Sequence, residues 1–437
     1  MGVQHQLPRM RPLSPRKSAI VSVLDVGTSK VVCLIARLDP LEPSAQRART
    51  HEARILGIGH QRSRGMKGGQ VVDMEQAETA IRLAVDAAER MAGVQVEASI
   101  VCASGGRIGS QQFAARIAVG DRSVSENDIH RVLEASCART GAEGRAALHS
   151  LPTRFSVDDA DGVRDPRGMI GAELGVHLHV ASCDFAAIRN LGLAVERCHL
   201  GVEAFVAAPY ASALAALTAD EMEIGATVVD FGGGTTSVAV FANGALIHMD
   251  AVAVGGQHVT LDVARGLNIR LSAAERLKTL YGSALPSSAD DRETFAIEQV
   301  GEETGRASHV PRSHLVRIIR PRVEEIVELA RDRLRNAGHP THAGSRIVVT
   351  GGASQLTGLA ETARRIFGGQ TRMGRPAGVQ GLPESARTPA FAAPVGLLVY
   401  PQVAIREHFE PSRARLQAAA NGDGYFARVG RWLKDSF

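Results

Sequence analysis

Two segments of the chain place a carboxylate, a glycine turn and hydroxyl side chains close together, a combination that can bind nucleotide phosphates and magnesium. The first, LDVGTSKVVCLIA, spans residues 24–36, and the second, VVDFGGGTTSVAVFA, spans residues 228–242. Asp25 and Asp230 are candidate catalytic carboxylates, because two carboxylates suffice to reach Mg²⁺ through the water ligands that this ion keeps. Glycine turns let backbone N–H groups approach phosphate oxygens closely. The side chains expected to add hydroxyl or ammonium donors are Thr28, Ser29, Lys30, Thr235 and Thr236.

The pattern of each segment predicts a β-hairpin. A β-branched apolar run ends in aspartate, a glycine turn follows, and a second β-branched run returns. P-loop and dinucleotide folds place their glycines between a strand and a helix, and the chain has neither Gly-Lys-Ser/Thr nor Gly-x-Gly-x-x-Gly. Those folds are therefore excluded. A plain surface hairpin would explain either segment alone, whereas two copies in one chain favour a ligand site.

A third segment, IVVTGGASQLTGL at residues 347–359, predicts a buried strand, a glycine turn and a helix. Its paired glycines would let a base or ribose lie flat against the backbone. Taken alone, an ordinary strand-to-helix turn explains this segment equally well. Its position after the two hairpins favours a nucleotide site.

The last thirteen residues, 425–437, predict an amphipathic helix that lies on a membrane. Its apolar face would hold Tyr425, Phe426, Val429, Trp432, Leu433 and Phe437, and its other faces Arg428, Arg431 and Lys434. The segment is too short and too charged to span a bilayer, which needs about 20 apolar residues, and it suits an anionic membrane surface. A terminal helix docked on its own domain is the alternative. The polar residues 407–424, with Pro411 and an Asn-Gly-Asp-Gly run, predict a flexible linker that would not hold such a helix.

The bulk composition narrows the class of protein further. A chain of 437 residues can bury a large core and is expected to form two or more lobes. Its formal net charge of +4, without a dense Lys/Arg block, argues against nucleic acid as a partner. Five cysteines without a Cys-x-x-Cys pair predict neither disulfides nor a zinc site, which fits a reducing cytoplasm. The basic, proline-rich residues 1–17 lack the apolar core of a secretory signal and predict a disordered tail.

Two phosphate hairpins followed by an adenosine turn resemble the actin, chaperone and sugar-kinase superfamily. Within it, the chain resembles the FtsA family of bacterial cell division proteins over about residues 18–402 and in the terminal helix. Further stretches that support this resemblance are RGMKGGQVVDMEQAETAI, VGGQHVTLDVARGLNI, AERLKTLYG, RIIRPRVEEIVELA and AFAAPVGLLVY. The resemblance implies an α/β, actin-like fold of two lobes, with ATP and Mg²⁺ in the cleft between them.

The resemblance also implies which residues contact the nucleotide. Asp25, Gly27, Thr28, Ser29 and Lys30 match the first phosphate motif, and Asp230, Gly232, Gly233, Gly234, Thr235 and Thr236 match the second. The adenosine motif corresponds to Gly351, Gly352, Ala353 and Ser354. Glu275 and Lys278 lie in the helix that reaches ribose and base in relatives, although a solvated i,i+3 ion pair is the alternative.

The implied domains interleave along the chain. Lobe one comprises residues 18–96, 186–210 and 381–402, with a relocated small α+β domain at 97–185. Lobe two comprises 211–270 and 346–380, with a small subdomain at 271–345. A tail at 1–17, a linker at 403–424 and the amphipathic helix at 425–437 complete the chain.

Two local features bear on catalysis and metal binding. By the resemblance, residues 201–217 correspond to the helix that links the lobes. Chaperone relatives carry a glutamate just before the proline of that helix, where it helps to position the attacking water. This chain has Ala208 at that place, and Glu203 lies nearby on an undetermined face, so we expect ATP binding with at most slow hydrolysis. His177 and His179 share one strand face, but no third ligand is near in sequence, and a solvent-facing strand edge is expected rather than a metal site.

The resemblance implies a scaffold that forms filaments at the cytoplasmic face of the inner membrane, at the division septum. It would hold the tubulin-like protein FtsZ by its C-terminal tail and help to recruit later division proteins. A basic cluster in residues 271–345 is the candidate site for that tail, with a solvated, ion-paired face as the alternative; its members are Arg312, Arg317, Arg320 and Arg322. Other possibilities are a superfamily kinase, which lacks a recognisable catalytic motif here, and the pilus protein PilM, which should lack the terminal helix.

Overall fold

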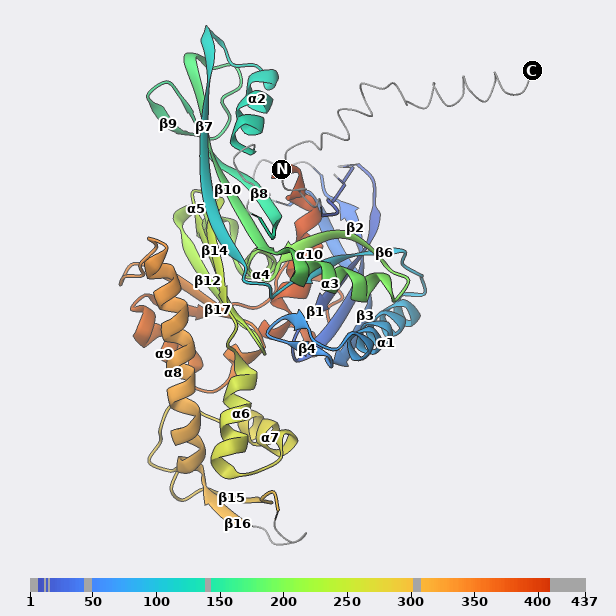
Figure 1. Cartoon of the computed structure of the whole chain (residues 1–437), viewed down its shortest axis with the longest axis vertical. Coiled ribbons are helices and arrows are strands. Elements are labelled where there is room, and N and C mark those ends of the chain that lie inside the picture. The colour runs from blue at the N-terminus through green and yellow to red at the C-terminus, as the bar shows by residue number, and fades with distance from the viewer. Residues whose placement is uncertain are drawn as a thin grey trace, which may run out of the picture.

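Lobe one is built on a mixed β-sheet (Figure 1). The computed structural model describes residues 7–11, 13–14, 16–42, 49–137, 143–301 and 308–408. The strands of this sheet, in spatial order, are β11 (Gly201–Ala207), β6 (Ala98–Ala103), β1 (Ala19–Val26), β2 (Lys30–Pro40), β3 (His51–Arg62) and β19 (Val379–Gln380). The short hairpin of β4 (Met66–Lys67) and β5 (Gln70–Val71) follows β3, and α3 (Phe185–Glu196) precedes β11.

Helix α1 (Met74–Ala92) packs on β2 and β3 because its alanine-rich face is smooth and because β3 carries glycines. A Cβ atom at Gly59 would lie 1.7 Å from the carbonyl oxygen of Ala84. The side chain of Asp73 caps the helix start by accepting the N–H of Gln76, and the helix ends at Gly93 with φ +69°.

The sheet of lobe two repeats the arrangement of lobe one. Its strands, in spatial order, are β14 (Ala245–Val252), β13 (Thr236–Ala242), β12 (Ala226–Phe231), β17 (Arg346–Thr350) and β18 (Gln370–Met373). As in lobe one, an antiparallel three-strand meander is followed by two parallel strands. The similarity of the two hairpin motifs therefore extends to the whole sheets.

The lower part of lobe two shares a hydrophobic core with the sheet above it. Its elements are α6 (Gly256–Leu267), α7 (Leu271–Tyr281), β15 (Thr294–Ile297), β16 (Ser308–Pro311) and the long α8 (Arg312–Asn336). One cluster of buried side chains runs from Val229 in β12 through Val259 in α6 and Leu277 in α7 to Leu334 in α8. Figure 1 shows α8 running from this subdomain up beside the sheet. The smaller helices α5 (Ala219–Ile224) and α9 (Leu359–Phe367) complete the lobe.

Two helices, α4 (Ala208–Ala216) and α10 (Ala392–Val399), cross in close contact between the lobes. A Cβ atom at Gly396 would lie 1.7 Å from the carbonyl oxygen of Ala211, so only glycine permits this approach. The expectation of one helix over 201–217 is wrong in its first half, because 201–207 form β11. Val202, Phe205 and Val206 favour a strand, and Pro209 at the first turn fits the helix start at Ala208.

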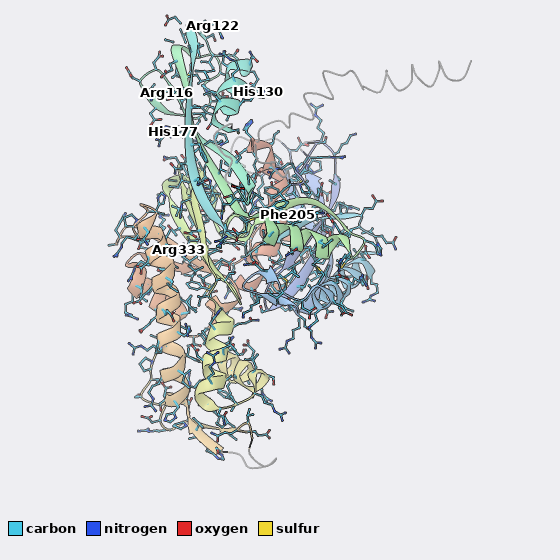
Figure 2. All side chains as sticks on the ribbon, in the orientation of Figure 1. Arg116, Arg122, His130, His177, Phe205 and Arg333 are labelled. Atoms are coloured by element: carbon cyan, nitrogen blue, oxygen red, sulfur yellow. The ribbon has the colours of Figure 1, made fainter. Side chains whose placement is uncertain are left out.

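The small domain that extends from lobe one has a four-stranded sheet with α2 (Glu126–Cys137) beside it (Figure 2, where Arg122 and His130 mark it). Its strand order is β7 (Gly109–Ser123), β10 (Ile170–Asp184), β8 (Arg145–Val157) and β9 (Ala160–Val163). Residues 98–103, expected at its start, form β6 of lobe one instead. His179 is also not on a solvent-facing edge: it is fully buried, in the strand between β7 and β8, and its Nε2 contacts the Ser110 hydroxyl at 2.7 Å.

The N-terminal segment differs from the expected disordered tail. Leu7 is buried, and Met10 and Leu13 pack against the main core. The guanidinium of Arg9 donates to the carbonyl oxygens of Ala147 at 2.9 Å and Leu148 at 3.0 Å in β8. Composition predicts disorder here, but these few apolar side chains find partners that lie far away in sequence.

Candidate functional site

The two glycine turns face each other across the cleft between the lobes. Pairing of Val26 with Val31 leaves residues 27–30 around the first turn, and pairing of Phe231 with Thr236 leaves 232–235 for the second. A Cβ atom at Gly234 would lie 2.4 Å from the hydroxyl oxygen of Thr28. Glycine therefore allows the two turns to approach as closely as they do, which brings both predicted phosphate motifs to one place.

Asp25 and Asp230 lie at the ends of β1 and β12, and both line this cleft. Burial raises the pKa of both carboxyl groups. For Asp230 the pKa rises to about 6, mainly through burial; the negative charge of Asp25 adds to the rise, while a hydrogen bond from the Ser212 hydroxyl opposes it. Two buried acids that disfavour each other's charge are suited to a cation held between them.

Lys30 supplies the positive charge of the first turn. Burial lowers the pKa of its ammonium group, and the carboxylates of Asp25 and Asp230 oppose that shift. The ammonium donates to the carbonyl oxygen of Ala390 and lies 4.2 Å from the ring centre of Phe391. This cation is therefore inside the cleft, beside the start of α10.

The predicted adenosine turn follows β17 and packs against the second hairpin. Gly351 has φ +88°, and a Cβ atom there would lie 2.2 Å from Oδ1 of Asp230. Gly352 and Ala353 in the short η1 turn (Gly352–Gln355) line the same cleft. The positive φ and the close approach to Asp230 both require glycine at position 351.

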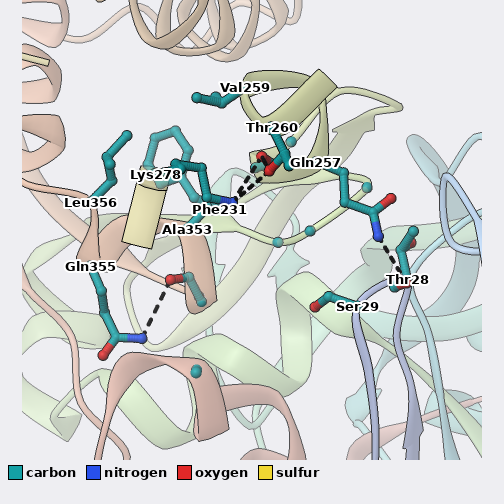
Figure 3. Close-up of a pocket in the computed structure, with 18 of the residues that line it drawn as sticks. Thr28, Ser29, Phe231, Gln257, Val259, Thr260, Lys278, Ala353, Gln355 and Leu356 are labelled. Carbon is teal, nitrogen blue, oxygen red and sulfur yellow. Dashed lines mark hydrogen bonds between the residues drawn. The ribbon is translucent and has the colours of Figure 1, made fainter. Parts of the chain in front are cut away.

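Glu275 and Lys278 form an i,i+3 ion pair at 2.7 Å, and both line the cleft. The Lys278 ammonium also donates to the Thr260 hydroxyl at 2.9 Å, as Figure 3 shows. Glu275 and Lys278 therefore form an ion pair and also line the cleft, although the sequence presented these two roles as alternatives.

The cleft has a volume of about 870 Å³, enough for a nucleotide. Most of the predicted contact residues line it: Asp25, Gly27, Thr28, Ser29, Lys30, Asp230, Gly232, Gly233, Gly234, Thr235, Glu275, Lys278, Gly351, Gly352 and Ala353. Thr236 and Ser354 do not. Their hydroxyls donate to the carbonyl oxygens of Val254 at 2.8 Å and Gly351 at 2.7 Å. These two side chains hold the backbone of the site instead of facing a ligand.

Ala208 lines the cleft as the first residue of α4, so the position that would orient an attacking water carries only a methyl group. Glu203 cannot replace it. It lies in β11, five residues earlier, and an extended strand separates the two by roughly 16 Å.

Sequence reasoning missed the start of α6. Gly255, Gly256 and Gln257 line the cleft, and the amide of Gln257 donates to the carbonyl oxygen of Thr28 at 3.1 Å (Figure 3). The signal was present as a Gly-Gly pair before a helical pattern, because glycines let the start of a helix pack closely against a neighbouring turn.

The basic cluster predicted as a docking site is largely ion-paired. Arg312 turns toward the cleft and pairs with Glu293 at 3.0 Å, and Arg320 pairs with Glu324 at 3.0 Å. Arg322 pairs with Asp262 and Glu325. Arg317 is exposed. The four side chains therefore do not form one continuous unpaired surface.

The membrane-binding residues predicted at 425–437 lie outside the described residues. Among the residues that the structure does describe, no helix is both long enough and apolar enough to cross a bilayer. In the same part of the chain, no group of three or more His, Cys, Asp or Glu side chains is placed to hold a metal ion directly.

Comparison with known proteins adds a family to this geometry. Residues 227–396 match the family model of the cell division protein FtsA, and residues 105–182 match that of the SHS2 domain inserted in FtsA. The chain is 50% identical to the cell division protein FtsA of Rhizobium meliloti (strain 1021), over 99% of this chain and 98% of that protein. It is 31% identical to FtsA of Escherichia coli (strain K12), over 96% and 98%.

Solved structures with the same fold are more distant in sequence. A PilM–PilN type IV pilus biogenesis complex matches 87% of this chain and 98% of its own, with TM-score 0.60 and 15% identity. MreB5 of Spiroplasma citri bound to ADP matches 90% and 98%, with TM-score 0.52 and 14% identity. At these identities the likeness shows the actin-like fold alone.

Proposed function

The chain belongs to the FtsA family of cell division proteins, and on that premise we propose that it is an ATP-binding, actin-like subunit that anchors FtsZ filaments to the membrane. It acts in cell division. In the proposal it polymerises at the cytoplasmic face of the inner membrane, at the division septum, and helps to recruit later division proteins.

One observation supports ATP and magnesium as ligands: the two glycine turns approach each other closely beside the carboxylates of Asp25 and Asp230. The turns at 27–30 and 232–235 would bind the phosphates, Asp25 and Asp230 would hold Mg²⁺ through water, and residues 351–353 with Lys278 would contact adenosine. The metal would neutralise phosphate charge in a buried site. A cation there would also relieve the repulsion between the two carboxylates.

Hydrolysis is expected to be slow or negligible in this proposal. A methyl group at Ala208 cannot orient water, and positioning normally supplies a large part of the acceleration of phosphoryl transfer. The nucleotide would then act mainly as a structural part of the subunit. Fast phosphate release from assembled filaments would contradict this part of the proposal.

Membrane attachment is assigned to the helix at 425–437, joined to the body by the later part of the predicted linker. The linker does not begin at 403 as expected, because Glu407 is buried against His149 and the N–H of His408 donates to the carbonyl oxygen of Ser150 at 2.8 Å. One short helix with three basic residues binds an anionic surface weakly, whereas a filament displays many helices and gains from effective concentration. FtsZ would be held by its C-terminal tail on the subdomain at 271–345, where Arg317 of the predicted basic cluster is exposed.

The experiment is a liposome pelleting assay with FtsZ, ATP and anionic vesicles, using the full chain and a version that ends at Gly424. We expect FtsZ in the pellet with the full chain alone. If the full chain pellets without FtsZ, the protein would instead serve a different membrane machine, such as a PilM-like pilus scaffold. If the shortened chain pellets equally well, the tail is not the anchor.

A further inference from the structure

Thr28, in the first phosphate turn, is the residue at which several segments converge. The N–H of Gly69, in the turn between β4 and β5, donates to its hydroxyl at 2.9 Å. Gly234 of the second phosphate turn packs directly against its side chain. The side-chain amide of Gln257 in α6 donates to its carbonyl oxygen at 3.1 Å. Two of these three contacts come from lobe two.

Gln257 is rigidly attached to the second phosphate turn. Its own N–H donates to the carbonyl oxygen of Gly233 at 2.7 Å, and the N–H of Gly256 donates to that of Gly232 at 3.0 Å. A Cβ atom at Gly255 would lie 2.6 Å from the Gly232 carbonyl oxygen, so this approach requires glycine. The start of α6 and the second turn therefore move as one body, and the Gln257 side chain reaches from that body to the opposite lobe (Figure 3).

We propose that Gln257 is a positioning residue that latches the two phosphate turns together and so controls how long a nucleotide stays in the cleft. This proposal rests on the ATP-binding function proposed above and adds the residue that regulates release. A nucleotide held by both turns leaves only when the lobes separate, and separation requires the bond between Gln257 and Thr28 to break. The Gln257 amide is bonded to the Thr28 carbonyl oxygen, so its proposed role concerns retention of the nucleotide, not activation of water.

The test separates donation of a hydrogen bond from filling of space. Gln257→Met keeps the side-chain volume and removes the donor, while Gln257→Glu places a carboxylate oxygen against the Thr28 carbonyl. Gln112→Met is the matched control, because Gln112 also donates across the lobes, to the Ile247 carbonyl at 3.2 Å, but outside the cleft. Dissociation of a fluorescent ATP analogue with Mg²⁺, chased by unlabelled ATP, is measured by stopped flow on full-length protein.

We expect Gln257→Met to accelerate dissociation about fivefold, which corresponds to about 1 kcal/mol for one hydrogen bond, and Gln257→Glu to accelerate it more. Gln112→Met should stay within about 1.5-fold of the parent protein. Equal rates for the parent protein and both Gln257 variants would overturn the latch, and so would equal acceleration by the Gln112 variant. A parent protein that binds no ATP analogue would overturn the proposed function as well. Melting temperatures without nucleotide identify a variant that is merely misfolded, and Gln257→Ala then takes its place.

Discussion

Two different requirements explain the residue types in the cleft: close approach of backbone and placement of charge. Gly234 and Gly351 have no side chain because a Cβ atom would collide with Thr28 or with Asp230. Asp25 and Asp230 have charges that are costly where they lie, since burial raises the pKa of each. Perturbed pKa values of this kind cluster at functional sites, and in the proposed function a bound cation offsets the cost of the two charges.

Asp230→Asn should therefore raise the stability of the fold and weaken the binding of Mg²⁺ and ATP. The pKa of Asp230 rises from 3.8 to about 6, so the carboxyl group stabilises the fold while it is protonated, and that contribution is lost as the pH rises through about 6. Without nucleotide, the variant should melt at a higher temperature than the parent protein at pH 7.5, and the difference should shrink to about a third of that effect at pH 4.5, which lies between the two pKa values. The effect at pH 7.5 is of the order of 2–3 kcal/mol.

The same variant should bind Mg²⁺ and ATP at least tenfold more weakly by calorimetry, because one of the two carboxylates facing the metal is gone. Exposed Asp121 is a suitable control, and Asp121→Asn should change neither property. A variant that melts at a lower temperature at pH 7.5 would show that Asp230 contributes through its Ser212 hydrogen bond rather than through its buried charge.

Elements whose signals are local could be predicted from the sequence. Both phosphate hairpins and the strand, turn and helix at 347–367 formed as expected, because β-branched runs and glycine turns specify them within a few residues. Features set by distant partners could not be predicted. Residues 98–103 join the lobe one sheet by pairing with β1 and β11, and His179 is buried because lobe two covers its strand. Composition likewise gave no indication that Leu7 would find a place in the core.

Arg9, near the N-terminus, and Glu407, the first residue after the η5 turn (Ala404–Arg406), interact electrostatically, and the Glu407 carboxylate is buried. Glu407 accepts a hydrogen bond from Nδ1 of His149 at 2.7 Å, and its side chain is 4% exposed. Nε2 of His149 accepts the N–H of Ala207, so this histidine is neutral and Glu407 carries the charge. Burial lowers the pKa of Arg9 to about 10, and the attraction of Glu407 opposes that shift. Two segments from opposite ends of the described chain therefore depend on one side chain.

Glu407→Gln should loosen the segment at 7–14 without unfolding the lobes. The Arg9 guanidinium would lose the attraction of a nearby negative charge. We expect hydrogen exchange at residues 9–11 to accelerate about tenfold or more, measured by mass spectrometry. Glu384→Gln is the control, because that side chain is 87% exposed and lies at the surface. Unchanged exchange at 9–11 would mean that the hydrogen bonds from the Arg9 guanidinium to the carbonyl oxygens of β8 hold the segment by themselves.

At the scale of the whole molecule, the small domain of lobe one reaches across and contacts lobe two. The Ser110 hydroxyl in β7 donates to the carbonyl oxygen of Met249 in β14 at 2.8 Å and accepts the Met249 N–H at 2.6 Å. Nε2 of His179 contacts the Ser110 hydroxyl within the small domain. In lobe two, the rings of His248 and His339 lie 5.1 Å apart. Nδ1 of His179 and Nε2 of His248 are buried without a hydrogen-bond partner among the described residues. A contact outside the cleft thus joins the same two lobes that the proposed nucleotide would join inside it.

Acid should weaken this contact between β7 and β14. Burial lowers the pKa of His179 to about 3 and that of His248 to about 4, from 6.5, because a proton added there finds no acceptor. When β7 and β14 separate, the two histidines take up protons as the pH falls below 6.5, whereas in the docked state they stay neutral. The free energy of docking therefore becomes less favourable between about pH 6.5 and pH 4. Hydrogen-exchange protection of β14, corrected for intrinsic exchange, should fall several-fold more between pH 7.5 and 5.5 than protection of β12. His179→Gln keeps a donor for Ser110 and does not titrate, so it should reduce this fall, whereas exposed His130→Gln should not. An equal fall in all three proteins would mean that other groups cause the acid sensitivity, and that the buried histidines serve only as packing between the lobes.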